Sequence, residues 1–261
     1  MSGIRARPVS GIPEVRAGDD LATLIVEALG HAALEERQVV AIAHTAVSKA
    51  EGAIVDLTRV TPSARAVELA AEGENGASRD PRVVQVVLDE SSEVLRAERG
   101  VLICRTRHGF VCANAGVDVS NSGAPDTAVL LPRDPDASAR RLRARLRELM
   151  GLGRTDGGGP AVVITDSFGR AWRHGQTDVA VGMAGMRALD DWRGRRDAAG
   201  LELRATWLAV ADAAAAAADL ARTKDSREPV VIIDGLARHL CDEDGPGAGA
   251  LVRPIEEDLF R

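Results

Sequence analysis

The chain has 261 residues, enough for one large domain or two modest ones with buried cores. Its net charge of −6 at pH 7 argues against a nucleic-acid coat, and its aromatic content of 2% argues against binding by base stacking. Cys104, Cys112 and Cys241 lack CxxC spacing, which argues against structural zinc and a disulfide framework. With no signal segment and no apolar stretch of bilayer length, we expect a cytoplasmic protein that binds neither membrane nor nucleic acid.

The first predicted element is a helix that follows the capping residues Asp19 and Asp20, because apolar residues recur at helical spacing from Leu21 to Leu29. A buried strand is predicted at 39–43, followed by a polar turn that presents His44, Thr45, Ser48 and Lys49. A second helix is predicted at 61–71. A longer third helix is predicted at 80–100, with Gly100 as its terminator.

Two strands joined at His108 and Gly109 are predicted next, followed by a short apolar run and an arginine-rich amphipathic helix from about Asp134. A glycine-rich break at 151–160 precedes a strand at 161–165 and a glycine-rich segment at 169–200. A strand at 201–211, an alanine-rich helix at 212–223 and a last strand at 229–235 complete the pattern. Because strands and helices alternate loosely, we predict an α+β fold of mixed sheets, with residues 1–261 as one domain and a subdomain boundary at 151–160 as the alternative.

Polar side chains follow the predicted strand at 39–43, where a rigid scaffold can aim them at a ligand. Lys49 would supply the cation that a phosphate-binding site needs, although no GxxxxGK[ST] motif is present. The alternative is that Lys49 is a solvated turn lysine.

The stretch "NAGVDVSNSG" at 114–123 offers the hard oxygen ligands that Mg²⁺ or Mn²⁺ prefers, from Asn114, Asp118 and Asn121. The alternative is a turn in which Asp118 accepts hydrogen bonds from nearby backbone N–H groups. The spacing favours neither interpretation over the other.

Asp166 and Ser167 follow the strand at 161–165, a layout by which nucleotide-using enzymes hold a metal ion. Arg170, Arg173 and His174 could form a cationic cluster that meets phosphate or carboxylate groups. The alternative is a capped turn with surface arginines. Acids at two strand ends, a lysine at a third and the arginines together suggest metal-assisted phosphoryl chemistry.

Motifs along nearly the whole chain resemble, in order and separation, those of the coenzyme F-420:L-glutamate ligase family; they include "TAVSKAEG", "GFVCANAGVDVSN", "VVITDSFGRAWRHGQTDVAVG" and "LVRPIEEDLFR". The resemblance implies a mixed α+β fold and an intertwined homodimer with the site near the subunit interface. It also implies the stand-alone form, without the C-terminal flavin domain of some relatives.

The same resemblance implies a GTP-dependent ligase that adds L-glutamate to the glutamate-free F-420 precursor and then adds further γ-linked glutamates. The acceptor carboxylate would become an acyl phosphate, and GDP and phosphate would be released. Two divalent ions, Mg²⁺ or Mn²⁺, would assist, and potassium is a further candidate ion.

Carried over residue by residue, the family pattern implies metal ligation by Asp118, Asp166 and Ser167, and catalytic roles for Asp118, Asp166 and Lys49. The implied nucleotide contacts are Ile12, Pro13, Glu14, Val15, His44, Thr45, Lys49, Asn121, Thr223 and Lys224.

The tract "ARTKDSREP" at 221–229 departs from the family pattern, because Thr223 stands where a glycine is expected. This departure places the coordination of the second metal ion in question. Two alternatives therefore remain open: a degenerate homologue that binds F-420 or a nucleotide without ligation, and a ligase for another small acid.

Overall fold

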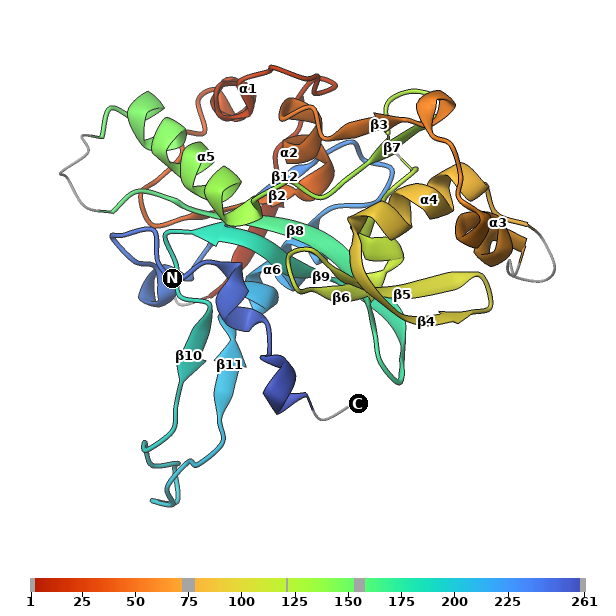
Figure 1. Cartoon of the computed structure of the whole chain (residues 1–261). Coiled ribbons are helices and arrows are strands. Elements are labelled where there is room, and N and C mark those ends of the chain that lie inside the picture. The colour runs from red at the N-terminus through yellow and green to blue at the C-terminus, as the bar shows by residue number, and fades with distance from the viewer. Residues whose placement is uncertain (1–2, 72–77, 121, 153–157, 259–261) are drawn as a thin grey trace.

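The computed structural model of the chain describes residues 3–71, 78–120, 122–152 and 158–258. Its centre is a mixed five-stranded sheet (Figure 1). In spatial order the strands are β1 (Arg5–Pro8), β12 (Val230–Asp234), β2 (Val39–Ala43), β8 (Ala161–Arg170) and β9 (Arg173–Ala184). Strands β2 and β8 run parallel, while the other neighbours are antiparallel. The predicted α+β class is therefore confirmed.

Both faces of this sheet are covered by helices, which explains why its central strands are almost continuously apolar. Val40 and Ile42 of β2 face one hydrophobic core, formed with α1 (Leu21–Leu29), α2 (His44–Ala50) and α5 (Pro135–Leu149). The alternate residues of β2, Val39 and Ala41, face a second core formed with α6 (Val210–Ala221). Figure 1 shows α5 and α6 on opposite sides of the sheet.

Local sequence signals explain the helices that were predicted correctly. Asp20 caps α1 by accepting a hydrogen bond from the Thr23 backbone at 3.1 Å. Asp134 caps α5 in the same way through Ala137 N, and Pro135 occupies the first turn.

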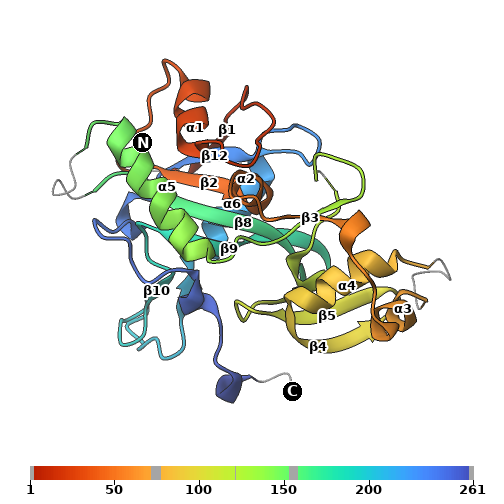
Figure 2. The same cartoon turned by 45° about the horizontal axis from the view of Figure 1, so that its top comes forward.

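A smaller layer lies beside the main sheet (Figure 2) and has its own hydrophobic cluster. A three-stranded sheet, β4 (Ser91–Glu98), β5 (Val101–Thr106) and β6 (Val111–Ala113), packs there with two helices, α3 (Ala64–Ala71) and α4 (Pro81–Glu90). Two short strands, β3 (Ile54–Asp56) and β7 (Thr127–Val129), pair with each other. The strands predicted on either side of His108 and Gly109 are confirmed as β5 and β6.

The single long helix predicted at 80–100 is wrong. Helix α4 ends at Glu90, and β4 begins at Ser91, whose hydroxyl donates to the Val87 carbonyl at 2.6 Å. Arg99 and Gly100 both have positive φ and turn β4 back onto β5. Pairing across this turn outweighs the helical spacing of the apolar residues.

Three other predicted segments differ from the structure. The polar turn after β2 is helix α2, and most of the predicted strand at 201–211 is irregular, with only β11 (Trp207–Ala209) extended. The glycine-rich segment at 169–200 contains the long strand β9. Gly182 lies in that strand, and the position requires a glycine because a Cβ there would lie 2.5 Å from the carbonyl oxygen of Pro135 in α5.

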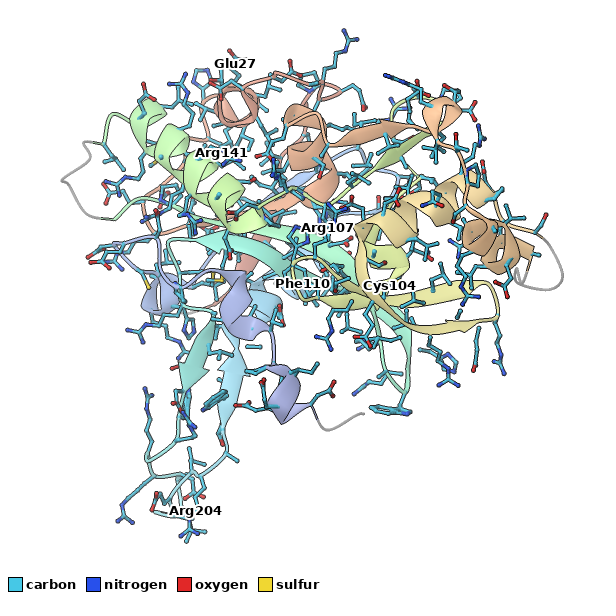
Figure 3. All side chains as sticks on the ribbon, viewed as in Figure 1. Glu27, Cys104, Arg107, Phe110, Arg141 and Arg204 are labelled. Atoms are coloured by element: carbon cyan, nitrogen blue, oxygen red, sulfur yellow. The ribbon has the colours of Figure 1, made fainter. Side chains whose placement is uncertain are left out.

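Strands β10 (Leu189–Asp191) and β11 pair as a narrow ribbon that projects from the body of the molecule (Figure 1). We call residues 189–209 the arm, and Arg204 lies near its tip (Figure 3). The described residues include no helix with the length and apolar character of a membrane span. The division into one domain or two stays a prediction, and residues 153–157 of the proposed boundary lie outside the described part.

Candidate active site

A cavity of about 1090 Å³ opens at the carboxyl ends of the parallel strands β2 and β8. In sheets that contain parallel strands, this edge is where ligands usually bind. Its walls come from five parts of the chain, within 12–15, 43–49, 112–123, 165–178 and 222–229. Its size suits a nucleotide with a second substrate better than a single small acid.

The register of β2 and β8 sets His44 beside Asp166, because Ala43 pairs with Thr165. His44 Nε2 lies 3.4 Å from Asp166 Oδ1, and the ring is buried. Its Nδ1 is buried too and has no hydrogen-bond partner within the described residues. Asp166 also accepts a hydrogen bond from the Ser167 backbone at 2.7 Å.

Lys49 reaches the same cavity from the end of α2, and its side chain is 10% exposed. Its Nζ lies 2.5 Å from Oε1 of Glu14, which belongs to the segment 12–15. The alternative of a solvated turn lysine is therefore wrong. Thr45 and the segment 12–15 also line the cavity, as their predicted role requires.

Asp118 also lines the cavity and is held by its backbone, which exchanges two hydrogen bonds with Val129. Its Oδ1 accepts hydrogen bonds from the backbone N–H and the hydroxyl of Ser120, at 2.7 and 2.6 Å. One oxygen thus forms the predicted turn, while Oδ2 accepts no hydrogen bond from the described residues. The two interpretations of this stretch are compatible. Asn121 lies outside the described residues.

Burial raises the pKa of Asp166, and the nearby carboxylates of Asp178 and Asp118 raise it further, although His44 and the Ser167 N–H act in the opposite direction. Three carboxylates therefore meet at one end of the cavity; we call Asp118, Asp166 and Asp178 the carboxylate cluster. No three or more His, Cys, Asp or Glu side chains of the described residues are grouped closely enough to hold a metal ion by themselves, but the negative charge of the cluster attracts a cation to this end of the cavity.

Most of the residues in the motifs described above line this one cavity, so proteins that share those motifs indicate what the site does. A family model described as "F420-0:Gamma-glutamyl ligase" matches residues 11–235. The chain belongs to this family. The predicted membership is thus confirmed, and with it the expectation of an enzyme of the ligase class.

Three curated relatives named "Coenzyme F420:L-glutamate ligase" match nearly the whole chain. The protein of Methanopyrus kandleri is 46% identical over 260 residues, covering 99% of this chain and 98% of the relative. That of Methanothermobacter thermautotrophicus is 43% identical, with 99% of each chain covered. That of Methanocaldococcus jannaschii is 37% identical, covering 96% of this chain and 94% of the relative.

Two residues of this family member escaped the sequence analysis, Asp178 and Arg222. The Asp178 side chain is 1% exposed and accepts hydrogen bonds from Thr165 Oγ1 and Ser167 Oγ, at 2.8 and 2.6 Å. Arg222 Nη2 donates to it at 2.6 Å. Burial acts to raise the pKa of Asp178, but Ser167, Arg222 and Thr165 together hold it below the ordinary value. Asp178 could have been identified from the sequence only if the β8–β9 hairpin and its pairing of Ser167 with Asp178 had been known.

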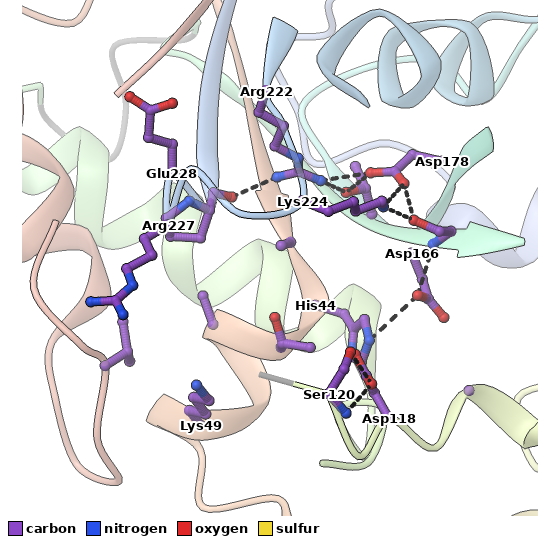
Figure 4. A pocket seen from close by; sticks show the side chains of 18 of the residues that line it. His44, Lys49, Asp118, Ser120, Asp166, Asp178, Arg222, Lys224, Arg227 and Glu228 are labelled. Atoms are coloured by element: carbon purple, nitrogen blue, oxygen red, sulfur yellow. Dashed lines mark hydrogen bonds and ion pairs between the residues drawn. The ribbon is translucent and has the colours of Figure 1, made fainter. Parts of the chain in front are cut away.

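The tract at 221–229 runs along the cavity of the ligase (Figure 4). Lys224 Nζ forms a hydrogen bond with Ser167 Oγ and lies 3.8 Å from Asp178 Oδ1. Thr223 also lines the cavity and donates its hydroxyl to Asp225 at 2.7 Å. Thr223 and Lys224 thus line the cavity, while their contact with a nucleotide stays a prediction.

The predicted cationic cluster of Arg170, Arg173 and His174 does not form part of the cavity wall. These residues lie at the exposed end of the β8–β9 hairpin, where Arg170 donates to the His174 carbonyl at 2.8 Å. Strand β8 carries them beyond the cavity. The basic groups that line it are instead Lys49, Arg222, Lys224 and Arg227.

Proposed function

We propose that the chain is a GTP-dependent ligase that joins L-glutamate to the glutamate-free F-420 precursor and then adds further γ-linked glutamates. The observation that carries this proposal is the 37–46% identity, over nearly the full chain, to relatives named coenzyme F420:L-glutamate ligase. A cavity that combines carboxylates with basic groups supports it independently.

Amide formation from a carboxylate needs activation, because a carboxylate oxygen is a poor leaving group. In the proposed reaction, an oxygen of the acceptor carboxylate bonds to the γ-phosphorus of GTP while the bond to GDP breaks. The glutamate amine then bonds to the acyl carbon, phosphate leaves, and the amine proton passes to solvent. No external oxidant or reductant is required.

Different cavity residues would bind the phosphates and the divalent ion in this reaction. Lys49, held by Glu14, offers its ammonium to the phosphates, and Ile12, Pro13 and Val15 provide a wall beside it. Asp118 and Asp166 would hold a divalent ion, Mg²⁺ or Mn²⁺, with the oxygen chemistry that either ion prefers. When bound, that ion would neutralise charge on the phosphates.

The decisive experiment incubates the protein with GTP, MgCl₂ or MnCl₂, L-glutamate and the F-420 precursor. We expect glutamylated products by mass spectrometry and equimolar GDP and phosphate. If neither glutamylated product nor GDP is formed, the proposal is overturned. Tight GTP binding without turnover would instead support the degenerate homologue, and product only with another acid would support the alternative ligase. Replacing KCl by NaCl tests the role of potassium.

We also propose that the enzyme works as a homodimer in the cytoplasm. The arm supports the first part, since it extends away from the body and exposes Leu201, Trp207 and Leu208. Apolar side chains on such a ribbon suit a second copy of the chain. The three free cysteines, two of them buried, suit a reducing compartment.

A further inference from the structure

Lys224 places a positive charge where the family resemblance implies a metal ligand. Its side chain crosses the open cavity, and its ammonium contacts oxygens from three residues, namely Ser167, Asp178 and Asp219. The Asp219 Oδ1 contact is 3.5 Å. An ammonium has three donors and no acceptor; that of Lys224 donates one hydrogen bond, to Ser167, and forms ion pairs with the carboxylates of Asp178 and Asp219.

Ser167 is consequently a poor ligand for a metal ion. Its hydroxyl proton is donated to Asp178, and its oxygen already contacts the Lys224 ammonium. A divalent ion at the same oxygen would be repelled by that ammonium at close range. Asp178 is equally engaged, because Arg222, Thr165 and Ser167 all donate to it.

Asp118 and Asp166 differ from this pair. Both line the cavity, and Oδ2 of each accepts no hydrogen bond from the described residues. Arg222 neutralises Asp178, and Lys224 is shared between Asp178 and Asp219. The two negative charges that remain, on Asp118 and Asp166, would balance the charge of one divalent cation.

We propose that the ammonium of Lys224 takes the place of a second divalent cation, so that the site binds a single divalent ion through Asp118 and Asp166. This inference rests on the proposed function for the identity of the ion, and it departs from the two ions that the resemblance implies. It makes Lys224 a positioning residue for Ser167 and Asp178 and a permanent source of charge beside the phosphates.

The composition of the chain makes this lysine unusual. Of its 33 basic residues other than histidine, only Lys49 and Lys224 are lysines, and both line the cavity. Arginine has a planar fork that favours bidentate contacts, whereas the compact ammonium of lysine acts as a point charge. A point charge is what a replacement for a metal ion requires.

The test counts bound Mn²⁺ by electron paramagnetic resonance, with GDP present, in the wild-type protein and in Lys224→Gln. We expect one ion per chain in the wild type and two in Lys224→Gln, because the amide removes the charge and offers an oxygen. Lys224→Arg keeps the charge and should stay at one ion, as should Arg170→Gln, which removes a positive charge at the exposed end of the β8–β9 hairpin, outside the cavity wall. Circular dichroism verifies that each variant is folded.

Two ions or none in the wild type would overturn the inference, and so would one ion in a folded Lys224→Gln. If that variant fails to fold, Lys224→Met takes its place and is likewise expected to bind two. Ion counts do not depend on the acceptor or on glutamate. A failure of the ligase assay and a failure of this inference are therefore separate results.

Discussion

His44 and Asp166 meet just past the last residue pair of β2 and β8, with Nε2 of the imidazole 3.4 Å from Oδ1 of the carboxylate. The contact joins residues that are distant in sequence but adjacent through the register of β2 and β8. The contacts of Asp166 with His44 and with the Ser167 N–H both use Oδ1, and Oδ2 accepts no hydrogen bond from the described residues. Burying this carboxylate costs free energy of folding, and a bound cation would offset that cost.

Replacing either acid of the cation site should therefore remove activity without unfolding the protein. We expect Asp118→Ala and Asp166→Ala to lower GDP release by at least about 10²-fold, the usual effect of removing one charge-stabilising group. Because burial disfavours the Asp166 charge, Asp166→Asn should melt no lower than the wild type in metal-free buffer. Calorimetry measures this, and an unfolded Asp166→Asn would show that the acid serves the core.

Lys49 should affect the binding of GTP more than the fold. Lys49→Met keeps the apolar stem but removes the ammonium that faces Glu14. We expect the KM for GTP to rise about tenfold, which corresponds to about 1.4 kcal/mol. Glu51→Gln, at the end of the same helix but paired with Arg141, is the matched control and should leave KM unchanged. Equal effects in the two variants would contradict a phosphate contact.

The pair formed by Arg222 and Asp178 should be important for stability. Arg222→Met leaves a carboxylate whose side chain is 1% exposed without its partner, a change that typically costs about 3–5 kcal/mol. The double variant Arg222→Met/Asp178→Asn should recover most of the loss in urea unfolding. Arg170→Met, at the exposed hairpin end, should change the unfolding free energy by less than about 0.5 kcal/mol. A double variant no more stable than the single one would contradict this account.

The cysteines should differ in reactivity. Burial raises the pKa of Cys112 to about 12, and the nearby Asp166 charge adds to the effect. Burial also raises the pKa of Cys104. At pH 8.5 we expect iodoacetamide to modify half-buried Cys241 first, with the other two reacting only in urea. Mass spectrometry locates the modified residue; rapid modification of Cys112 in the native protein would contradict the burial seen here.

The arm should control assembly. In size-exclusion chromatography with light scattering, we expect the wild type to have twice the chain mass of 27.4 kDa. Leu208→Arg should have the mass of a single chain. Leu220→Arg alters an equally apolar and more exposed side chain on α6, and it should leave the dimer intact. A monomeric wild type, or a dimer that survives Leu208→Arg, would show that the arm has another purpose.

Sequence reasoning was most successful where structure depends on neighbouring residues. The caps Asp20 and Asp134 and the apolar strands could be identified locally. The polar residues noted after apolar runs, Lys49, Asp118 and Asp166, all line the cavity, although Asp166 lies within β8 and not after it. Lys49 and Asp166 reach the same cavity because residues 39–43 of β2 and 161–165 of β8, which precede them in the chain, are parallel neighbours. That adjacency is the usual expectation for polar residues at strand ends.

What could not be predicted depends on pairing between distant segments. Asp178 enters the site because β9 folds back on β8 in a particular register. Arg222 enters it because the tract at 221–229 folds back on itself before β12, so that Arg222 donates to the Pro229 carbonyl. Strand β4 was missed for the same reason, since its partner β5 and the turn at Arg99 determine it. Periodicity within one segment contains none of this information.

The dispersal of the cavity walls over the chain also has a consequence for biosynthesis. The first wall residues lie near position 12 and the last near 229, and the strand that ends this series, β12, inserts between β1 and β2. A growing polypeptide on the ribosome therefore has no complete cavity until nearly nine-tenths of it has been made. Ligand affinity should thus report completed folding, because partly synthesised chains lack a wall of the pocket.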